Sequence, residues 1–255
     1  MTSTGSHGLA IVTGGASGIG LATTVVLLAA GWKVCVLDNS AKSIDAARSQ
    51  LQADAASLHF AKADVTDENE IDRLVGEACD RLGPVRGVVT SAGIARVMPF
   101  LETTPAMFRS IHEVNVIGTF NVCQSAARRM KDTGGGAIVT VASVSGLAGN
   151  MERSAYGSSK GAVVNLTRIM AVELGPYGIR VNCIAPGPID TPMVEAMHQG
   201  ESRRLWVERS LLGRYGKPEE IGEVAAFLLD ARRASYVTGQ ILAVDGGFMA
   251  GGVIG

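Results

Sequence analysis

Short runs of β-branched and apolar residues alternate along this chain with longer segments of helical periodicity. Most of these runs are almost continuously apolar, which is typical of strands that are covered on both faces. Regular β-α-β alternation predicts right-handed crossovers and one parallel sheet. The fold class that we expect is therefore α/β, with a doubly wound, seven-stranded parallel sheet and helices on both faces. The predicted strands are Leu9–Thr13, Lys33–Asp38, Leu58–Ala63, Gly87–Thr90, Ala137–Ala142, Arg180–Ile184 and Ile241–Val244.

Six helices are expected between these strands: Gly18–Ala30, Ala41–Ala53, Glu68–Leu82, Pro105–Lys131, Ser154–Leu174 and Pro218–Asp230. No linker, repeat or low-complexity stretch interrupts the pattern, so residues 1–255 are expected to form a single domain. The longest departure follows the sixth strand, at about 188–214. Because open α/β sheets bind ligands at the carboxyl ends of their strands, we expect this insertion to form a small helical lid. The alternative is an insertion that only packs at the periphery.

The composition excludes several classes of protein. The chain is 47% hydrophobic, and 23 Lys+Arg against 24 Asp+Glu give a net charge of −1. Such a chain is not intrinsically disordered, and a pI of about 6.4 argues against a nucleic-acid partner. Residues 1–8 do not have the pattern of a signal peptide, and the longest apolar stretch, Ile19–Ala30, is too short to span a membrane. We expect a cytoplasmic protein with reduced thiols at Cys35, Cys79, Cys123 and Cys183.

A glycine-rich loop, Thr13-Gly14-Gly15-Ala16-Ser17-Gly18-Ile19-Gly20, follows the first predicted strand and opens the first predicted helix. Glycines allow a tight turn there, and the helix directs its positive end at a pyrophosphate. Such a loop is weak evidence alone, but here the second strand ends in Asp38, 18 residues after Gly20. This context predicts a Rossmann-type dinucleotide site that includes Gly14, Ser17, Gly18, Ile19 and Gly20.

Asp38 also bears on the choice of cofactor. A carboxylate at this position accepts hydrogen bonds from the adenosine ribose and repels a 2′-phosphate. The glycine loop and the two positions after Asp38 contain no Arg or Lys, although Lys42 follows soon after. NAD is therefore favoured over NADP. Asp38 could equally cap the next helix, which would not exclude the ribose role. Asp64 and Val65 are expected near the adenine, although Asp64 could instead be the N-cap of the following helix.

Tyr156 and Lys160 are four residues apart in a predicted helix, so their side chains share one face. A phenol with its ordinary pKa of about 10 is a poor base near neutrality. A nearby ammonium lowers that pKa and makes the phenol a usable proton donor or acceptor. Ser143 ends the fifth strand, where its hydroxyl could hold the substrate oxygen. Together with a dinucleotide loop, these three residues predict a catalytic site.

With these motifs the sequence resembles the short-chain dehydrogenase/reductase family, in its compact single-domain branch. The resemblance covers nearly the whole chain, from the glycine loop through Asn115, Ser143, Tyr156-x-x-x-Lys160, Asn182, Pro186-Gly187 and Thr191 to Asp245-Gly246-Gly247. It implies that hydride moves between a substrate carbon and a nicotinamide ring while Tyr156 exchanges the proton. It further implies that Ser143 orients the substrate oxygen, that Lys160 lowers the pKa of Tyr156 and binds the nicotinamide ribose, and that Asn115 supports a water relay.

The resemblance also implies further cofactor contacts and no metal. These contacts are Ser91, Ala92, Gly93, Pro186, Gly187, Ile189 and Thr191. One position departs from the family pattern, which usually has Asn-Asn-Ala-Gly after the fourth strand where this chain has Thr90-Ser91-Ala92-Gly93. The second asparagine of that pattern ties neighbouring strands together. Because Ser91 offers only one hydroxyl, it can replace only part of that network.

The expected substrate is a small secondary alcohol or ketone, and a cyclic alcohol, a sugar or polyol, a hydroxysteroid and a hydroxyacyl group all remain open. Ser145–Met151, Gly187–Met193 and Val194–Trp206 are expected to frame its pocket. Apolar walls could come from Ile94, Met98 and Phe100. Four polar side chains lie in or near these segments: Asn150, Arg153, His198 and Arg204. A lone polar side chain of this kind is more often solvated than in contact with a ligand.

The apolar C-terminus, Phe248–Gly255, suggests burial against a neighbouring subunit, and the resemblance implies a homotetramer. The alternatives are a dimer, or a tail that folds back on its own subunit. Two rival functions remain. One is an NADPH-dependent 3-oxoacyl-carrier-protein reductase, with Arg128, Arg129 and Arg168 as a dock for an acidic carrier. The other is a non-catalytic dinucleotide sensor, which would need neither Tyr156 nor Lys160.

Overall fold

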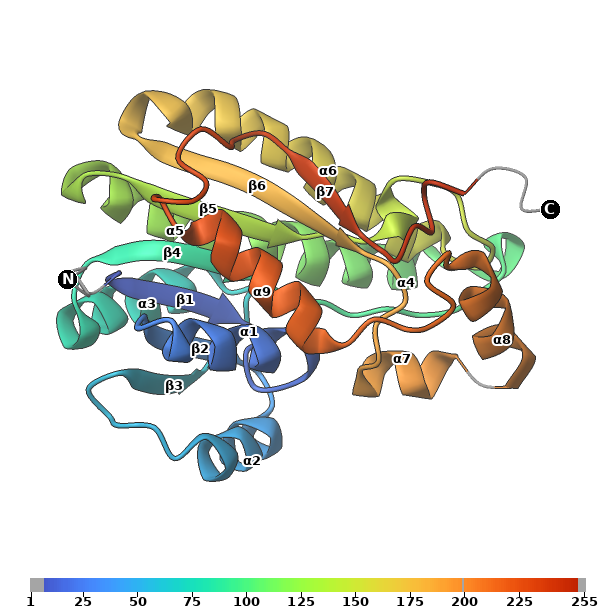
Figure 1. Ribbon diagram of the computed structural model, residues 1–255, viewed down its shortest axis with the longest axis horizontal. Helices are drawn as coiled ribbons and strands as arrows, with labels where there is room; N and C mark the ends of the chain where they lie inside the picture. The colour runs from blue at the N-terminus through green and yellow to red at the C-terminus, as the bar shows by residue number, and fades with distance from the viewer. Residues whose placement is uncertain (1–6, 199, 252–255) are drawn as a thin grey trace.

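A computed structural model of the chain describes residues 7–198 and 200–251. Its centre is one sheet with the strand order β3-β2-β1-β4-β5-β6-β7, in which every neighbouring pair is parallel (Figure 1). The predicted fold class is confirmed, and each predicted strand end is correct to within two residues. The strands are β1 (Leu9–Thr13), β2 (Lys33–Asp38), β3 (Leu58–Lys62), β4 (Val85–Thr90), β5 (Gly136–Val141), β6 (Ile179–Pro186) and β7 (Ile241–Val244).

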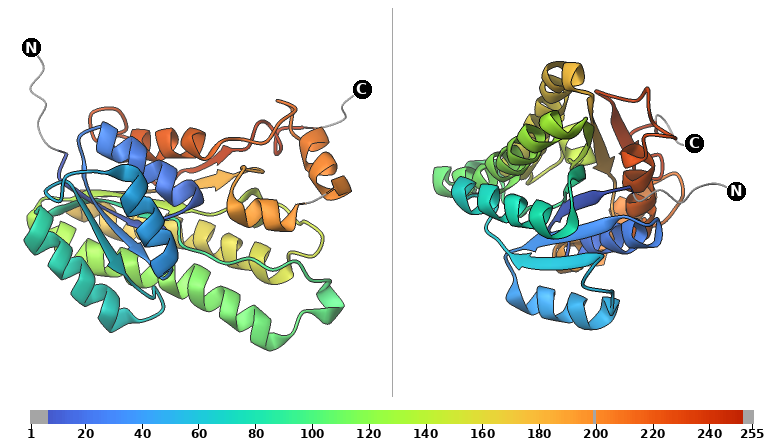
Figure 2. Two further views of the ribbon diagram at one scale, coloured as in Figure 1. Left: turned by 90° about the horizontal axis from the view of Figure 1, so that it is seen from below. Right: turned by 90° about the vertical axis from the view of Figure 1, so that its left-hand side faces the viewer.

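Helices cover both faces of the sheet (Figure 2). Residues of α1, α2 and α9 pack in the core on one face, and residues of α3, α5 and α6 pack in the core on the other. The α-helices are α1 (Gly18–Ala29), α2 (Ala41–Leu51), α3 (Glu68–Leu82), α4 (Pro105–His112), α5 (Gly118–Thr133), α6 (Ser154–Leu174), α7 (Pro192–Met197), α8 (Gly200–Arg209) and α9 (Pro218–Leu229).

The central strand β1 shows why these runs become buried strands. Leu9 and Ile11 belong to one core cluster, whereas Ala10 and Val12 belong to the other. All four side chains are fully buried. Successive residues of a strand point to opposite faces, so a continuous apolar run fills both layers at once.

The long predicted helix Pro105–Lys131 is wrong as a single regular helix. A π-helical turn, Glu113–Ile117, separates α4 from α5. In such a turn each N–H bonds to the carbonyl five residues back, which inserts one residue and changes the faces that follow. Asn115 lies in this turn with a fully buried side chain. The hydrogen bonds of the Asn115 side chain to Ile94 and Ser159 stabilise this irregular turn.

The segment 188–214 contains the short helices α7 and α8, beside the carboxyl ends of the strands (Figure 1). The start of this segment is joined to Gly216, two residues beyond its end. Gly216 N donates to Pro188 O and Asp190 N donates to Gly216 O, both at 2.9 Å. Phe248 stacks on Trp206 of α8, with ring centroids 5.1 Å apart. This part of the apolar tail thus folds back on its own chain. Residues 252–255 of the tail, and residues 1–6 at the other end, lie outside the described part.

Candidate active site

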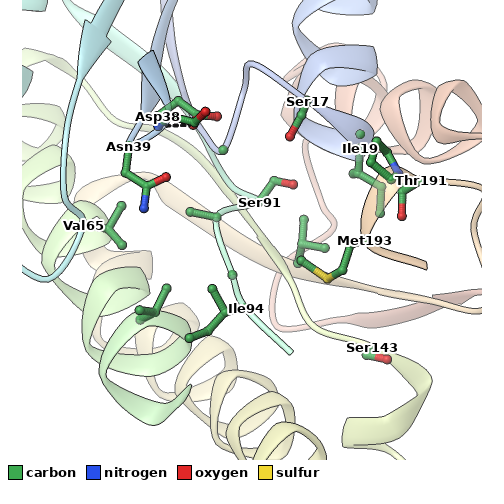
Figure 3. A pocket seen from close by; sticks show the side chains of 18 of the residues that line it. Ser17, Ile19, Asp38, Asn39, Val65, Ser91, Ile94, Ser143, Thr191 and Met193 are labelled. Atoms are coloured by element: carbon green, nitrogen blue, oxygen red, sulfur yellow. Dashed lines mark hydrogen bonds between the residues drawn. The ribbon is translucent and has the colours of Figure 1, made fainter. Parts of the chain in front are cut away.

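The carboxyl ends of the strands surround a cavity of about 570 Å³. Nearly all of the predicted site residues line it, although they come from many different elements. Figure 3 shows that Asp38 and Ser143 approach this cavity from opposite sides of the view. The predicted residues on its wall are Gly14, Ser17, Gly18, Ile19, Asp38, Asp64, Val65, Ser91, Ala92, Gly93, Ser143, Tyr156, Lys160, Pro186, Gly187, Ile189 and Thr191. Gly20 and Asn115 lie behind the wall.

The glycine loop is shaped by close backbone contacts. Gly14 has a φ of +62°, and a Cβ built on it would lie 2.9 Å from the backbone of Ala92. A Cβ on Gly20 would collide with the carbonyl oxygen of Gly14, so Gly20 permits the turn without touching the cavity. Ser17 is the N-cap of α1, but its side chain does not cap the helix, and the first turn contains no acid. The positive end of α1 therefore faces the cavity, as a pyrophosphate requires.

Asp38 is held in place by two backbone donors. Its Oδ2 accepts a hydrogen bond from Ala16 N at 3.2 Å, and its Oδ1 accepts one from Ser40 N at 3.0 Å. The N-cap of α2 is Ser40, whose Oγ accepts from Ser43 N, so the capping alternative for Asp38 is wrong. A carboxylate has about four acceptor sites, and the two that remain are available to ribose hydroxyls.

The adenine end of the cavity is built by the segment after β3. Asp64 is exposed and its Oδ1 accepts hydrogen bonds from the N–H and hydroxyl of Thr66, at 2.9 and 2.8 Å. The N-cap of α3 is Asp67, which accepts from Glu70 N at 2.9 Å, so the capping alternative for Asp64 is wrong as well. Val65 is buried and lines the cavity, where it offers an apolar contact to a flat ring.

Ser143, Tyr156 and Lys160 form the other end of the cavity. Ser143 follows β5, and its Oγ accepts a hydrogen bond from Ser145 N at 3.1 Å. Lys160 is buried and donates from Nζ to the carbonyl of Val141 at 2.8 Å. Its Nζ lies 5.8 Å from the centre of the Tyr156 ring. The helical spacing thus brings phenol and ammonium to one face of α6, beside the serine hydroxyl.

Burial changes the acid–base properties of this end of the cavity. It raises the pKa of Tyr156, while the Ser143 hydroxyl and the charge of Arg153 oppose that rise. Burial also lowers the pKa of Lys160 to about 8. The cation that favours the phenolate is thus Arg153, a role that its position in the sequence does not indicate. The guanidinium carbon of Arg153 lies 5.9 Å from the centre of the Tyr156 ring.

Asn115 fixes the geometry behind Lys160. Its Oδ1 accepts from Ile94 N at 2.8 Å, and its Nδ2 donates to Ile94 O and to Ser159 Oγ, both at 3.0 Å. These bonds tie the π turn to the segment after β4 and to α6, which accounts for the interrupted helix. Between them lies Gly93, on which a Cβ would be 3.1 Å from Asn115 Oδ1 and 3.5 Å from Lys160 Nζ. A side chain at residue 93 would therefore crowd both polar groups.

The departure at Thr90-Ser91 has visible consequences. No hydrogen bond of the Ser91 side chain is found among the described residues; the strand ends are instead joined by Ala92 N, which donates to Thr13 Oγ1 at 3.1 Å. Thr90 is buried at the end of β4, and its Oγ1 is the one buried side-chain polar atom of the described chain that has no hydrogen-bond partner. The strands are therefore tied together by Thr13 instead of Ser91.

The polar residues expected around the substrate behave differently from one another. Arg204 is exposed and pairs with Glu201 and Glu208 on its own helix. Arg153 and His198, in contrast, are buried and contact each other, with 2.9 Å between Nη2 and Nε2. Asn150 donates to Ser145 Oγ at 3.2 Å.

Of the expected apolar walls, Ile94 lines the cavity (Figure 3). The placement of Phe100 is wrong: a 3₁₀ turn at Phe100–Glu102 directs this side chain to the outside, where it is 77% exposed. Met98 is not part of the cavity wall, and forms a bridge with Arg153.

Some residues of the cavity wall were not found from the sequence. Asn39 and Ser40 follow Asp38 directly, so their position after β2 was a usable signal. Ser110, Glu113 and Val114 reach the cavity from α4 and the π turn. Nothing in the helical periodicity signals these three, because the inserted residue changes which face of the helix is turned to the cavity.

The chain is similar to known dehydrogenases and reductases. A family model described as enoyl-(acyl carrier protein) reductase matches residues 14–249. The chain is 42% identical to a galactitol 2-dehydrogenase (L-tagatose-forming) of Cereibacter sphaeroides, over 94% of each chain. It is 40% identical to a cis-4-hydroxycyclohexanecarboxylate dehydrogenase of Sinomonas cyclohexanicum, over 95% of this chain and 96% of the relative. A crystal structure of levodione reductase superimposes with a TM-score of 0.92 and 35% identity, over 97% of this chain and 99% of that one.

Proposed function

Because the chain belongs to the short-chain dehydrogenase/reductase family, we propose that it is an NAD-dependent enzyme that interconverts a secondary alcohol and a ketone. Its membership of a family of oxidoreductases makes the general class of reaction secure. The observation that carries the proposal is that Tyr156, Lys160 and Ser143 line the same cavity as the glycine loop and Asp38. A proton-transfer site and a dinucleotide site thus share one space.

The cavity fits a nicotinamide dinucleotide. The uncapped start of α1 and the glycine loop would hold the pyrophosphate, Asp38 the adenosine ribose, and Val65 the adenine. Lys160 would hold the nicotinamide ribose, with Ser91, Ala92 and Gly93 along the backbone. Pro186, Gly187, Ile189 and Thr191 would border the nicotinamide ring. When bound, the nicotinamide supplies or accepts the hydride.

Tyr156 exchanges the proton with the substrate oxygen. In ketone reduction its hydroxyl donates a proton to that oxygen, and in alcohol oxidation its phenolate accepts one. Ser143 holds the same oxygen through its hydroxyl. Arg153 carries positive charge close to the ring, which favours the phenolate and opposes the effect of burial. The family resemblance gives Lys160 the same role, and its Nζ lies 5.8 Å from the ring centre. Asn115 would support a water relay from Lys160 to solvent, since it holds the π turn against α6.

The preference for NAD rests on Asp38. Its carboxylate is fixed by Ala16 N and Ser40 N, so it cannot easily turn away from a 2′-phosphate on the ribose. The cavity wall contains no Arg, and its one Lys is Lys160, at the other end. An enzyme that binds NADP needs a cation near that phosphate.

A small cyclic alcohol or a polyol is the substrate class that the relatives support best. The names of those relatives refer to galactitol, to cis-4-hydroxycyclohexanecarboxylate and to levodione. The helices α7 and α8 would act as a lid over the substrate, within one domain that spans residues 1–255. We also propose a cytoplasmic homotetramer, as the family resemblance implies. No helix in the described part of the chain is long and apolar enough to cross a membrane.

A reduction of 3-oxoacyl groups on a carrier protein is the second candidate. The description of the matching family model favours it. The proposed dock for an acidic carrier is weakened by Arg129, which donates to Asp72 at 2.7 Å and is therefore paired within its own subunit. A dinucleotide sensor has no specific support, because Tyr156 and Lys160 would then serve no purpose.

The decisive experiment measures initial rates with NAD and NADP, or with NADH and NADPH in the reverse direction. The substrate panel contains cyclic alcohols and ketones, polyols, and 3-oxoacyl thioesters. Turnover of a cyclic alcohol or polyol with NAD preferred supports the proposal. Turnover of the thioester with NADPH preferred would replace it by the second candidate, and NADH binding without turnover of any panel member would favour the sensor.

A further inference from the structure

Arg153 is a cation held in place by the fold. It directly precedes α6 and is 8% exposed. Its backbone forms a bridge with Met98, whose N–H donates to the carbonyl of Glu152 at 3.1 Å. Its carbonyl accepts from Gly157 N in the first turn of the helix. The backbone of Arg153 is therefore fixed with respect to Tyr156, which lies three residues further along the same helix.

The side chain of Arg153 contacts two residues at the end of α7. Nη2 lies 2.9 Å from Nε2 of His198, and Nη1 lies 3.5 Å from Sδ of Met197. Since a guanidinium only donates, Nε2 of His198 is the acceptor, and Nδ1 carries the proton that it donates to the hydroxyl of Tyr215 at 3.0 Å. His198 is therefore neutral, and burial together with the charges of Arg153 and Arg203 lowers its pKa to about 4.

No carboxylate balances this charge within the described part of the chain. Two arginines of α8, in contrast, have acidic partners: Arg203 pairs with Asp190, and Arg204 pairs with glutamates of its own helix. Arg153 forms no such pair, and its neighbour Glu152 is exposed to solvent. A buried charge is costly unless it is paired, and an arginine cannot avoid the cost by losing its proton.

The position of this cation is significant for the substrate. Its guanidinium carbon lies 5.9 Å from the centre of the Tyr156 ring, close enough for its charge to act on the phenol that exchanges the proton. Its weakest contact is the one with the sulfur of Met197, since a thioether is a poor acceptor. The Nη1 group of Arg153 that contacts this sulfur is therefore available to a stronger acceptor. The same holds for the other N–H groups of its guanidinium that have no partner among the described residues.

Arg153 is not part of the wall of the cavity around Tyr156 but lines a separate cleft of about 330 Å³, between residues 145–150 and the first turns of α6. Residues 145–151 are among the segments that the sequence predicts to frame the substrate. A molecule in this cleft would reach Arg153 from the side of Ser145 and Asn150, whose hydroxyl and amide are further polar groups on its wall.

We propose that Arg153 binds a carboxylate group of the substrate, so that the preferred substrate is a hydroxy or oxo acid. This inference rests on the proposed function, because it takes the space beside Tyr156 as the substrate site. A carboxylate fits better than a phosphate, since one guanidinium neutralises one negative charge and matches the planar carboxylate with two parallel hydrogen bonds. His198 keeps the guanidinium in this orientation while adding no second charge.

The test compares matched acid and amide probes. Cyclohexanecarboxylate and cyclohexanecarboxamide are titrated as inhibitors and as ligands in the presence of NADH, by calorimetry. The 2-, 3- and 4-oxocyclohexanecarboxylates and their amides are compared as substrates. We expect the acid to be preferred by about 10- to 100-fold over the amide, the range of one hydrogen-bonded charge pair. Arg153→Gln should abolish the preference, and Arg153→Lys should keep part of it.

Two controls keep the outcomes separate. Arg204→Gln removes one positive charge from α8 at an exposed position and should leave the acid preference unchanged. Cyclohexanone reduction by the wild-type protein tests the proposed function without any carboxylate. If the wild-type protein binds the acid and Arg153→Gln does not, but the wild-type protein reduces no ketone, the anion site is supported and the proposed reaction is rejected.

Turnover of cyclohexanone with no preference for acids in the wild-type protein would retain the reaction and overturn the role of Arg153. The same conclusion follows if Arg153→Gln lowers the melting temperature but keeps the acid preference, since Arg153 would then only fasten α7 to α6. If Arg153→Gln does not fold, a reduced acid preference in Arg153→Lys would still support the proposal, because lysine keeps the charge but not the planar two-bond geometry. An undiminished preference in Arg153→Lys would overturn the two-bond geometry.

Discussion

The carboxylate of Asp38 accepts a hydrogen bond of 3.2 Å from the backbone N–H of Ala16, 22 residues earlier in the chain. This bond connects the end of β2 to the glycine loop, so the residue proposed to select the cofactor also shapes the loop that would bind it. Cofactor preference and loop geometry are consequently linked through one side chain.

Asp38→Asn should therefore have two effects. The ratio of kcat/KM for NAD to that for NADP should fall by about tenfold or more, because the repulsion of the 2′-phosphate and a charged hydrogen-bond acceptor are both lost. The melting temperature should also fall, since an amide nitrogen cannot accept from Ala16 N or Ser40 N. Asp45→Asn, on the exposed face of α2, removes the same charge and should change neither quantity. An unchanged ratio in Asp38→Asn would refute the role of this carboxylate.

Tyr156→Phe should lower turnover by at least about 100-fold, because the group that exchanges the proton is removed. NADH binding, followed by fluorescence titration, should change little, since the glycine loop and Asp38 lie elsewhere in the cavity. Tyr177→Phe is the matched control, because this tyrosine is 45% exposed and lies outside the cavity. Equal turnover in Tyr156→Phe and the wild-type protein would show that another group moves the proton.

His198 makes stability depend on pH. Its folded-state pKa of about 4 lies below the ordinary value of 6.5, so between these two pH values the unfolded chain binds a proton that the folded chain excludes. The free energy of unfolding should therefore fall as the pH is lowered from about 6.5 to about 4. His198→Gln keeps an acceptor for Arg153 and a donor for Tyr215 but does not titrate.

Urea unfolding of wild type and His198→Gln at several pH values measures this contribution. The advantage of the wild-type protein should shrink as the pH falls through this window. Parallel curves for the two proteins would mean that His198 has the same pKa in the folded and unfolded chain, which would contradict its burial as a neutral acceptor for Arg153.

Thr90→Val should stabilise the protein. The change removes the buried hydroxyl that has no partner while keeping the shape of the side chain, so a gain of about 1 kcal/mol is expected, or about 2–4 °C in melting temperature. Thr140 is the paired residue on the adjacent strand β5, and its hydroxyl lies 2.7 Å from that of Thr167. Thr140→Val is thus the matched control and should destabilise. A loss of stability in Thr90→Val would indicate that a buried water satisfies this hydroxyl.

Features encoded by neighbouring residues were predictable from the sequence. The strands follow from continuous apolar runs, and the glycine loop and the pair Tyr156–Lys160 follow from short fixed spacings. The lining of the cavity by Ser143 and Asp38 followed from the rule that the carboxyl ends of parallel strands meet at one edge of the sheet.

Features that depend on contacts between distant segments were not predictable. Arg153 and His198 are 45 residues apart, and neither residue's neighbours indicate that the two meet in a buried place. Phe100 lies in an apolar context but turns outward, because a 3₁₀ turn sets its direction. The π turn has no signature in the apolar periodicity, since the hydrogen bonds of Asn115 come from Ile94 and Ser159.

The π turn has a consequence for how this protein can change over evolution. It offsets the helical phase between α4 and α5, so α4 and the turn can present Ser110 and Val114 to the cavity while α5 keeps Val122 and Ala126 in the core. Substitutions on the cavity side of α4 can therefore alter the shape of the site without disturbing the packing of α5. Deletion of one residue from the turn would rotate α4 relative to α5, so that Ser110 and the core residues of α5 could not all keep their present positions.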